Sequence, residues 1–487
     1  MKLKADAWLF GAGILGIAGV LFLPLPWGDR SLPWFERLTP ASLVSFLAWL
    51  LAAGGFWAFK TRFWPNDAQA GRQLRNAILL MVLHAVLLRA TVELMAAYGA
   101  GRWPWLPGDA WVWMPWFVVP GLTGILLGGR LGVLASLIGG LMLYLLANPG
   151  PWPVVGCIVS PLAGILLMRR SPTRNRVLRA GAGSGALLGV VAAIEYGLKG
   201  QAVDAVAAAV LLPAVIGFFS AFVVLAILPV LEWMLGELSD VTLIEYGTDH
   251  PLLDQLREEA PGTWHHSVNV ADLAEKAAAE IGARALFCKA SALYHDIGKL
   301  KEPALFAENS GAGSPHHQLD PLTSAQKIKE HVTYGLELAR KHRLPRAFQN
   351  IIAEHHGVSL VRFFYAKACE PRPDGTKPEV DRAAFCYPGP PPSTRESGIV
   401  ALADAIEAAS RSVPLKSEGE MRAFVRKLIA DRISEGELAA CPLTLADIAR
   451  IETAFVVWLK GRNHLRPAYP EATVRAGSLA ERTAAGS

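Results

Sequence analysis

Long apolar runs fill the first half of the chain and stop near residue 235. A helix that crosses a bilayer needs about 20 mainly apolar residues, and eight runs approach or exceed that length. The first run lacks a convincing small-residue cleavage site, so we interpret it as an uncleaved anchor. The last run continues into Leu231-Glu232-Trp233, which predicts one continuous helix that leaves the membrane. The predicted spans are 7–27, 41–59, 77–98, 111–127, 131–148, 153–168, 180–197 and 206–234.

Lysine and arginine gather in alternate loops between these runs. They precede the first span and follow the second, fourth and sixth, whereas the intervening loops carry little net positive charge. Because positively charged loops stay on the cytoplasmic side, this alternation predicts that both termini are cytoplasmic. The basic residues concerned are Lys2, Lys4, Lys60, Arg62, Arg72, Arg75, Arg130, Arg169, Arg170, Arg174, Arg176 and Arg179.

Beyond residue 260 the apolar positions recur at the spacing of amphipathic helices. Pro261-Gly262-Thr263 is a helix-start signal with Thr263 as a candidate cap, and this helix is predicted to end at Gly282. No segment shows a convincing strand pattern, so we predict an all-α fold. Further helices are predicted over 284–296, 323–343, 345–357 and 399–412.

These patterns divide the chain into a membrane domain (1–238), a connector (239–260), a soluble catalytic domain (261–466) and a disordered tail (467–487). With 52% hydrophobic and 18% charged residues, the chain is too apolar for an ordinary soluble protein. The net charge of +5 comes largely from arginines beside the spans, so we expect no DNA or RNA partner. Five scattered cysteines without CxxC pairs are typical of a reducing compartment.

The third span contains three ionisable residues, His84, Arg89 and Glu93. Arg89 and Glu93 are four residues apart, so they share a helix face and can form an ion pair. Ionisable groups within a membrane are functional candidates. We favour a structural pair over an ion or proton path, because no second polar span offers a matching path.

A histidine directly followed by an aspartate, His295-Asp296, offers a metal ion a nitrogen and a carboxylate from adjacent positions. More histidines and one aspartate stand on inward faces or at the ends of predicted helices. A lone inward histidine is more often a hydrogen-bonded core residue than a ligand, but burying the whole set without a metal would be costly. The predicted ligands are His266, His295, Asp296, His331, His355, His356 and Asp404.

The chemistry of these side chains narrows the choice of metal. Imidazole and carboxylate without thiolate suit Fe, Mn or Zn better than Mg or Ca. Seven ligands are too many for one ion, so we predict two ions bridged by Asp296, which would activate a hydroxide for in-line attack on phosphorus. Lys299 is predicted to balance phosphate charge, with a solvated cation at a helix end as the alternative.

The order H…HD…H…HH…D resembles that of the HD phosphohydrolase superfamily. Longer stretches, spread through the soluble half, resemble the PgpH family of membrane-anchored HD phosphodiesterases. Members usually carry a large extracellular domain after the first span, whereas only residues 28–40 fill that gap here. The matching stretches are Pro261-Gly-Thr-Trp-His-His-Ser267, Tyr294-His-Asp-Ile-Gly-Lys299, Glu354-His-His-Gly357, Phe363-Phe-Tyr-Ala-Lys367, Tyr387-Pro-Gly-Pro390 and Ala401-Leu-Ala-Asp404.

The resemblance implies an enzyme that hydrolyses cyclic di-AMP to the linear dinucleotide pApA. It also implies a two-metal site, usually of iron or manganese, with Asp296 shared between the ions. One ion would be bound by His266, His295, Asp296 and Asp404, and the other by Asp296, His331, His355 and His356.

Tyr365 and Lys367 lie in one of the matching stretches and are candidates for nucleotide contacts, with packing and a salt bridge as equal alternatives. The expected location is the bacterial inner membrane, with the lipid bilayer and a cyclic dinucleotide as partners and the catalytic domain in the cytoplasm. The sequence leaves the oligomeric state open, with a homodimer as one option. It also leaves open which signal, if any, the membrane half senses.

Two other functions remain as alternatives. The first is an HD hydrolase of cyclic di-GMP or of a (p)ppGpp-type nucleotide. The absence of a Gly-Tyr-Pro motif after the HD pair argues against the usual cyclic di-GMP branch. The second is a non-catalytic membrane receptor that binds nucleotide, which would not need a complete set of metal ligands.

Overall fold

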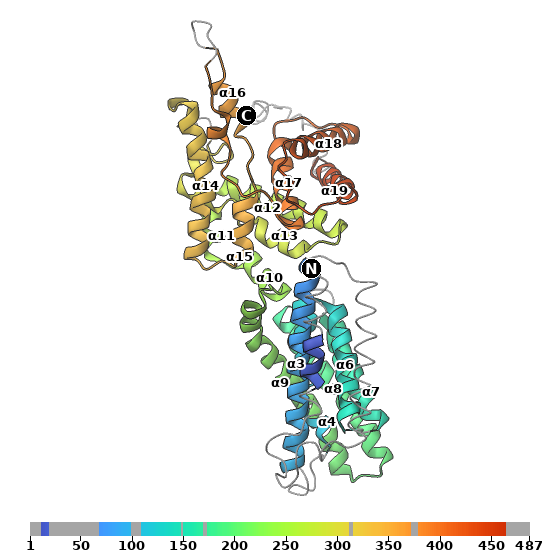
Figure 1. The fold of residues 1–487 in the computed structure, drawn as a ribbon. Helices are drawn as coiled ribbons and strands as arrows, with labels where there is room; N and C mark the ends of the chain where they lie inside the picture. The colour runs from blue at the N-terminus through green and yellow to red at the C-terminus, as the bar shows by residue number, and fades with distance from the viewer. Residues whose placement is uncertain are drawn as a thin grey trace, which may run out of the picture. The chain divides into compact units, whose positions relative to one another are not determined.

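The structure is a computed structural model that describes residues 11–18, 68–98, 109–147, 150–168, 173–310, 315–371 and 378–463. The chain divides into two compact units, Met1–Leu243 and Ile244–Ser487. Within the described ranges the regular elements are helices, and extended pairing is limited to an isolated bridge between Leu360 and Cys386. The predicted all-α fold is therefore confirmed (Figure 1).

The membrane unit is a set of long apolar helices that run side by side (Figure 1). Among the described residues, five helices are long and apolar enough to cross a membrane: Gly71–Leu94 within α3, Gly129–Leu146 within α6, Pro151–Met168, Arg174–Leu198 and Val203–Leu235. They match the third, fifth, sixth, seventh and eighth predicted spans. Of the first predicted span only 11–18 is described, as a helix, and the second (41–59) lies outside the described residues. The helices are α3 (Ala68–Tyr98), α4 (Ala110–Trp113), α5 (Val118–Leu127), α6 (Gly129–Ala147), α7 (Pro151–Met168), α8 (Arg174–Leu198) and α9 (Val203–Leu235).

The fourth predicted span, 111–127, is not one continuous helix. It is broken into α4 and α5, and Met114 between them has an extended backbone with ψ 132°. Met114 precedes Pro115, and the proline ring disfavours the helical conformation for the residue before it. The prediction of a single helix here was wrong because it weighed apolar length without this local restriction.

The predicted ion pair in the third span is present. Arg89 Nη2 lies 2.6 Å from Glu93 Oε1 on α3. One turn earlier, the buried ring of His84 stands edge-on to Trp116, with ring centroids 5.8 Å apart. A side chain at Gly139 would overlap the His84 ring, so this glycine makes room for it.

The last membrane helix continues beyond its apolar run, as predicted, and ends at Leu235. Glu232, in its last turn, is buried and accepts hydrogen bonds from the Ser239 backbone N–H (2.8 Å) and the Thr242 hydroxyl (2.9 Å). From α3, the Asn76 side-chain amide donates to the Leu235 carbonyl at 3.3 Å. The end of α9 and the start of the next helix are therefore held by specific polar contacts.

The soluble unit is also helical, including most of the segment predicted as a connector. Residues 239–260 form two short helices, α10 and α11, and His250 caps the second by accepting from the Leu252 backbone N–H. The helices are α10 (Asp240–Thr248), α11 (Pro251–Glu259), α12 (Pro261–Glu280), α13 (Ala285–Ala292), α14 (Pro321–Lys341), α15 (Arg346–Glu354), α16 (Arg362–Ala368), α17 (Arg395–Ser410), α18 (Glu418–Ser434) and α19 (Leu445–Asn463). The predicted tail lies outside the described residues.

Helix α12 begins where the sequence predicts but is not capped by Thr263. The N-cap is Ala260, and Thr263 lies inside the first turn, where its backbone N–H donates to the Asn309 side chain at 3.1 Å. A residue distant in the sequence therefore satisfies this N–H group. The apolar face predicted for α12 is buried, with Val270, Leu273 and Ala274 at 0% exposure.

Gly298 allows the segment that follows His295-Asp296 to pack closely against α14. A Cβ atom there would overlap the His331 carbonyl oxygen and lie 2.6 Å from the Gly335 nitrogen. We expect Gly298→Ala to lower the free energy of unfolding by about 3 kcal/mol, because backbone atoms cannot move aside cheaply. Denaturant unfolding of the detergent-solubilised chain, followed by circular dichroism, measures this.

The control for this prediction is Gly419→Ala. A Cβ atom at Gly419, in the first turn of α18, meets nothing within 4 Å. Its replacement should leave stability unchanged or raise it slightly, because alanine favours helix. Equal stability of the Gly298→Ala and wild-type proteins would contradict the close approach.

Candidate metal centre

Five helical segments converge on the residues predicted to bind metal. His266 lies early in α12, and His295 and Asp296 follow α13. His331 is on α14, and the pair His355-His356 follows α15. Asp404, on α17, completes the set, and all seven residues are buried except His356, which is partly buried.

The side chains form two groups, each with ligand atoms within 4.8 Å of one another. The first group is His266, His295 and Asp404. The second is Asp296, His331, His355 and His356. The structure therefore brings together all seven residues predicted from the sequence.

Asp296 lies between the two groups and turns one carboxylate oxygen to each. Its Oδ2 is 3.4 Å from His266 Nε2 and 3.2 Å from His295 Nε2. Its Oδ1 is 3.4 Å from His331 Nε2 and 3.7 Å from His355 Nε2. With one oxygen toward each group, Asp296 could be shared between two ions.

The histidine rings are oriented by hydrogen bonds from the nitrogen that faces away from the centre. Nδ1 lies 2.6 Å from the Ala292 carbonyl in His295 and 2.6 Å from the Ile328 carbonyl in His331. In His355 it lies 2.8 Å from the carbonyl of Ile352. Since a carbonyl only accepts, Nδ1 carries the hydrogen in each of the three rings, and this bond turns Nε2 inward, as in metal-binding histidines.

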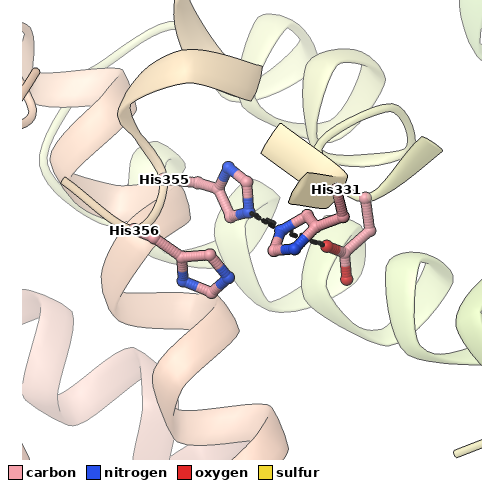
Figure 2. Close-up of side chains that lie close together, drawn as sticks. His331, His355 and His356 are labelled. Carbon is pink, nitrogen blue, oxygen red and sulfur yellow. Dashed lines mark hydrogen bonds and ion pairs between the residues drawn. The ribbon is translucent and has the colours of Figure 1, made fainter. Parts of the chain in front are cut away.

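In the second group the rings face one another across a small gap. Figure 2 shows His331, His355 and His356 turned toward a common space, and His331 Nε2 lies 3.3 Å from His355 Nε2. Within the part of the chain that the structure describes, His295 Nε2 and Asp296 Oδ1 are buried and form no hydrogen bond. Such atoms are costly to bury unless a further partner binds them, so the donor set fits divalent metal ions.

The electrostatics of the cluster agree with this fit. Burial would raise the pKa of Asp296, but His295 and Lys299 outweigh it and hold the pKa well below its usual range. Burial also opposes protonation of His295, yet Asp296 and Asp404 raise its pKa to about 10. For His331, burial dominates and lowers the pKa to about 3. The carboxylates are therefore ionised, and positive charge is favoured between them.

Glu407 contacts the first group but was not among the residues predicted from the sequence. Its Oε2 lies 2.6 Å from His266 Nδ1, and its other contacts are Arg411 and Asn269. It therefore orients His266 as the backbone carbonyls orient the rings of His295, His331 and His355. The sequence held one signal, since Glu407 stands three residues after Asp404 and shares its helix face.

We expect Glu407→Gln to weaken metal binding to the first group by about 10- to 100-fold, since outer partners of metal-binding histidines contribute by that factor. Metal titration of the chelator-treated protein measures this. Glu258→Gln, at an exposed position on α11, is the control and should bind metal as the wild type does. Unchanged affinity in Glu407→Gln would contradict the orienting role.

Lys299 lies inside the site rather than at a solvated helix end, so that alternative was wrong. Its exposure is only 9%, and its ammonium lies 2.8 Å from Asp296 Oδ2 and 2.6 Å from Glu308 Oε1. These two carboxylates outweigh the effect of burial and raise the pKa of Lys299, which stays charged. Lys299 thus holds Asp296 in place, and its role in balancing phosphate charge stays a prediction.

The two predicted nucleotide contacts on α16 do not reach the site. Tyr365 packs on the ring of Phe385, with centroids 5.6 Å apart, and belongs to a separate small apolar cluster. Lys367 is exposed, and neither residue lines the cavity beside the metal-binding groups. The packing interpretation therefore accounts for Tyr365.

A cavity of about 900 Å³ opens beside the two groups. His266, His356 and Asp404 form one side of it, and α17 and α18 supply much of the remainder. Besides Lys299, four more cationic side chains line it, which suits a ligand with more than one negative charge. They are Arg362, Arg411, Lys427 and Arg432.

Comparison with known proteins places this architecture in a family. Residues 41–239 match the family model described as a 7TM receptor with intracellular HD hydrolase, and residues 263–409 match the HD domain. PgpH of Bacillus subtilis, a cyclic-di-AMP phosphodiesterase, is 31% identical over 434 residues, which cover 87% of this chain. The chain belongs to the PgpH family. The family matches and the five apolar helices among the described residues show that the chain is a multi-pass membrane protein with a metal-dependent HD domain.

Listeria monocytogenes supplies a further relative, PgpH, and a crystal structure of a PgpH HD domain. Its PgpH, also a cyclic-di-AMP phosphodiesterase, is 36% identical over 261 residues, which cover 53% of this chain. A crystal structure of that protein's HD domain with cyclic-di-AMP is 37% identical, covering 45% of this chain and 100% of the domain, with a TM-score of 0.42. The present chain spans 60% of the length of the Bacillus protein and 36% of the Listeria protein.

Proposed function

We propose that this chain is a metal-dependent phosphodiesterase that hydrolyses cyclic di-AMP to linear pApA. The observation that carries the proposal is Asp296, whose two carboxylate oxygens face two separate groups of metal-binding side chains. The substrate is inferred from the two PgpH relatives, both of which are cyclic-di-AMP phosphodiesterases.

In such a reaction, different residues of the protein would hold the two ions. His266, His295 and Asp404 would hold one ion, and His331, His355 and His356 the other, with Asp296 shared. Two such ions activate a water molecule and neutralise the charge that develops on the phosphate oxygens. Iron or manganese is preferred by analogy with the family, and zinc suits the same donors.

Hydrolysis at this site adds one water molecule across one phosphodiester bond. The water oxygen bonds to phosphorus, the bond from phosphorus to the ribose oxygen breaks, and that oxygen receives a proton. One phosphodiester of the ring is thereby opened, and the other is retained in the linear product. Lys299 and Glu308 keep Asp296 oriented throughout.

The proposed orientation places the soluble unit in the cytoplasm. It is supported by the alternation of arginine-rich and arginine-poor loops along the membrane half. The substrate would therefore be drawn from the cytoplasmic pool, and the membrane helices would anchor the enzyme.

The full-length protein in detergent, loaded with Mn²⁺, provides the test. We expect the protein to convert cyclic di-AMP to pApA faster than it converts cyclic di-GMP or (p)ppGpp in parallel reactions. Chromatography measures the products. Preferential turnover of another nucleotide would replace the proposed substrate. Nucleotide binding without turnover by the metal-loaded protein would favour a receptor instead.

A further inference from the structure

Helix α18 presents one face to the cavity, and none of the residues on it belongs to the predicted metal set. Phe424, Lys427, Leu428 and Asp431 all line the cavity. Their spacing of three, four and seven residues puts them on one side of a helix. This face of α18 therefore forms one side of the cavity and presents apolar, aromatic and charged side chains to it.

The part of α17 that lines the same cavity is built from small side chains. Ala405, Ala408 and Ala409 line it next to Asp404. Larger residues at these positions would fill the space, whereas alanines leave it open and present only methyl groups to it. An aromatic ligand group is favoured in such a space beside Phe424, the aromatic residue among those lining the cavity.

The cationic residues of the cavity differ in how much of their charge is already neutralised. Arg362 pairs with Glu435 at 2.7 Å, and Arg411 pairs with Glu407 at 2.9 Å. Arg432 pairs with Glu437, and Lys299 pairs with Asp296 and Glu308. Lys427 is exposed, and among the described residues it forms no ion pair. Its ammonium is thus the cavity cation most available to a phosphate group.

We propose that α18 binds the half of the substrate that is not cleaved, with Lys427 on the second phosphate and Phe424 stacked on a nucleobase. This inference rests on the proposed function. A cyclic dinucleotide carries two phosphates on opposite sides of its ring, so when one lies at the metal-binding groups the other must lie elsewhere in the cavity. Lys427 and Phe424, one helical turn apart, meet a phosphate and a base of the same nucleotide.

Two substitutions in the full-length protein test this assignment, Lys427→Gln and Phe424→Leu. We expect each to raise the KM for cyclic di-AMP by about 10-fold, since a charged hydrogen bond and a base–aromatic stack each contribute on that scale. The kcat should change little, because these contacts are the same in the bound substrate and the transition state. Hydrolysis of methyl p-nitrophenyl phosphate, a diester with one phosphate and no base, should be unaffected.

Arg426→Gln is the matched control. Arg426 is adjacent to Lys427 on α18, does not line the cavity, and pairs with Glu452 at 3.0 Å. The same loss of charge there should leave the KM for cyclic di-AMP unchanged. An unchanged KM in both Lys427→Gln and Phe424→Leu would overturn the assignment, as would equal losses on both substrates.

Failure of the proposed function would be distinguishable from failure of this inference. If the wild type hydrolyses the simple diester but not cyclic di-AMP, the proposed substrate is wrong. Equilibrium dialysis with labelled cyclic di-AMP then decides the role of α18 separately. Weaker binding by Lys427→Gln and Phe424→Leu than by Arg426→Gln would support it, and equal binding by all three would reject it.

Discussion

Replacing Asp296 by asparagine is expected to lower the rate of cyclic di-AMP hydrolysis by more than about 100-fold. Even a residue that only orients a ligand contributes about 10- to 100-fold, and Asp296 faces both metal-binding groups directly. Asparagine has nearly the same shape but no charge, so it cannot bridge two cations in the same way. Initial rates at saturating substrate and metal analysis of the same preparation measure the effect.

The metal content separates a loss of binding from a loss of folding. We expect Asp296→Asn to hold fewer than the two ions per chain predicted for the wild type, while its helical circular dichroism is retained. Asp249→Asn, at an exposed position outside the site, should match the wild type in both measurements. Near-normal turnover with a full metal complement in Asp296→Asn would show that this carboxylate does not bridge the ions.

Removal of metal by a strong chelator is expected to abolish hydrolysis. The buried histidines and aspartates provide nitrogen and carboxylate donors but no activated nucleophile of their own. Readdition of Mn²⁺ or Fe²⁺ should restore the rate, whereas Mg²⁺ and Ca²⁺ should not, because imidazole-rich sites suit transition metals. Activity assays after dialysis, together with metal analysis, follow both steps.

The response to chelation also distinguishes the enzyme from a pure nucleotide receptor. A protein that keeps its full rate after its metal has been removed would contradict the two-metal proposal. Restoration by Mg²⁺ alone would point to a site built mainly on oxygen donors. The Glu407→Gln variant, with its weaker first group, should lose activity at lower chelator concentration than the wild type.

Much of the architecture follows from local features of the chain. Apolar length marks the spans of α3, α6, α7, α8 and α9, and helical spacing marks the buried face of α12. Both signals depend on residues close together in the sequence, so they can be recognised without a structure. The break between α4 and α5 is also local, at Met114-Pro115, but it was hidden by the apolar run around it.

Contacts between distant residues were not predictable in the same way. Glu407 and His266 are 141 residues apart, and their hydrogen bond exists only because α12 and α17 pack together. Asn309 likewise satisfies the N–H of Thr263 from 46 residues away, which is why the expected cap was wrong. For Tyr365 the sequence left a nucleotide contact and packing as equal alternatives, and the structure shows it packed on Phe385.

The sequence by itself determined the helical class, the membrane and soluble halves and the seven residues of the candidate centre, because residue type and helical spacing carry that information. Only the tertiary structure decided how those residues are used. It turned the two oxygens of Asp296 to different groups, paired Lys299 with Glu308 and brought residues of α18 and the alanines of α17 to the same cavity. These features depend on distances between helices, which packing sets and local sequence does not.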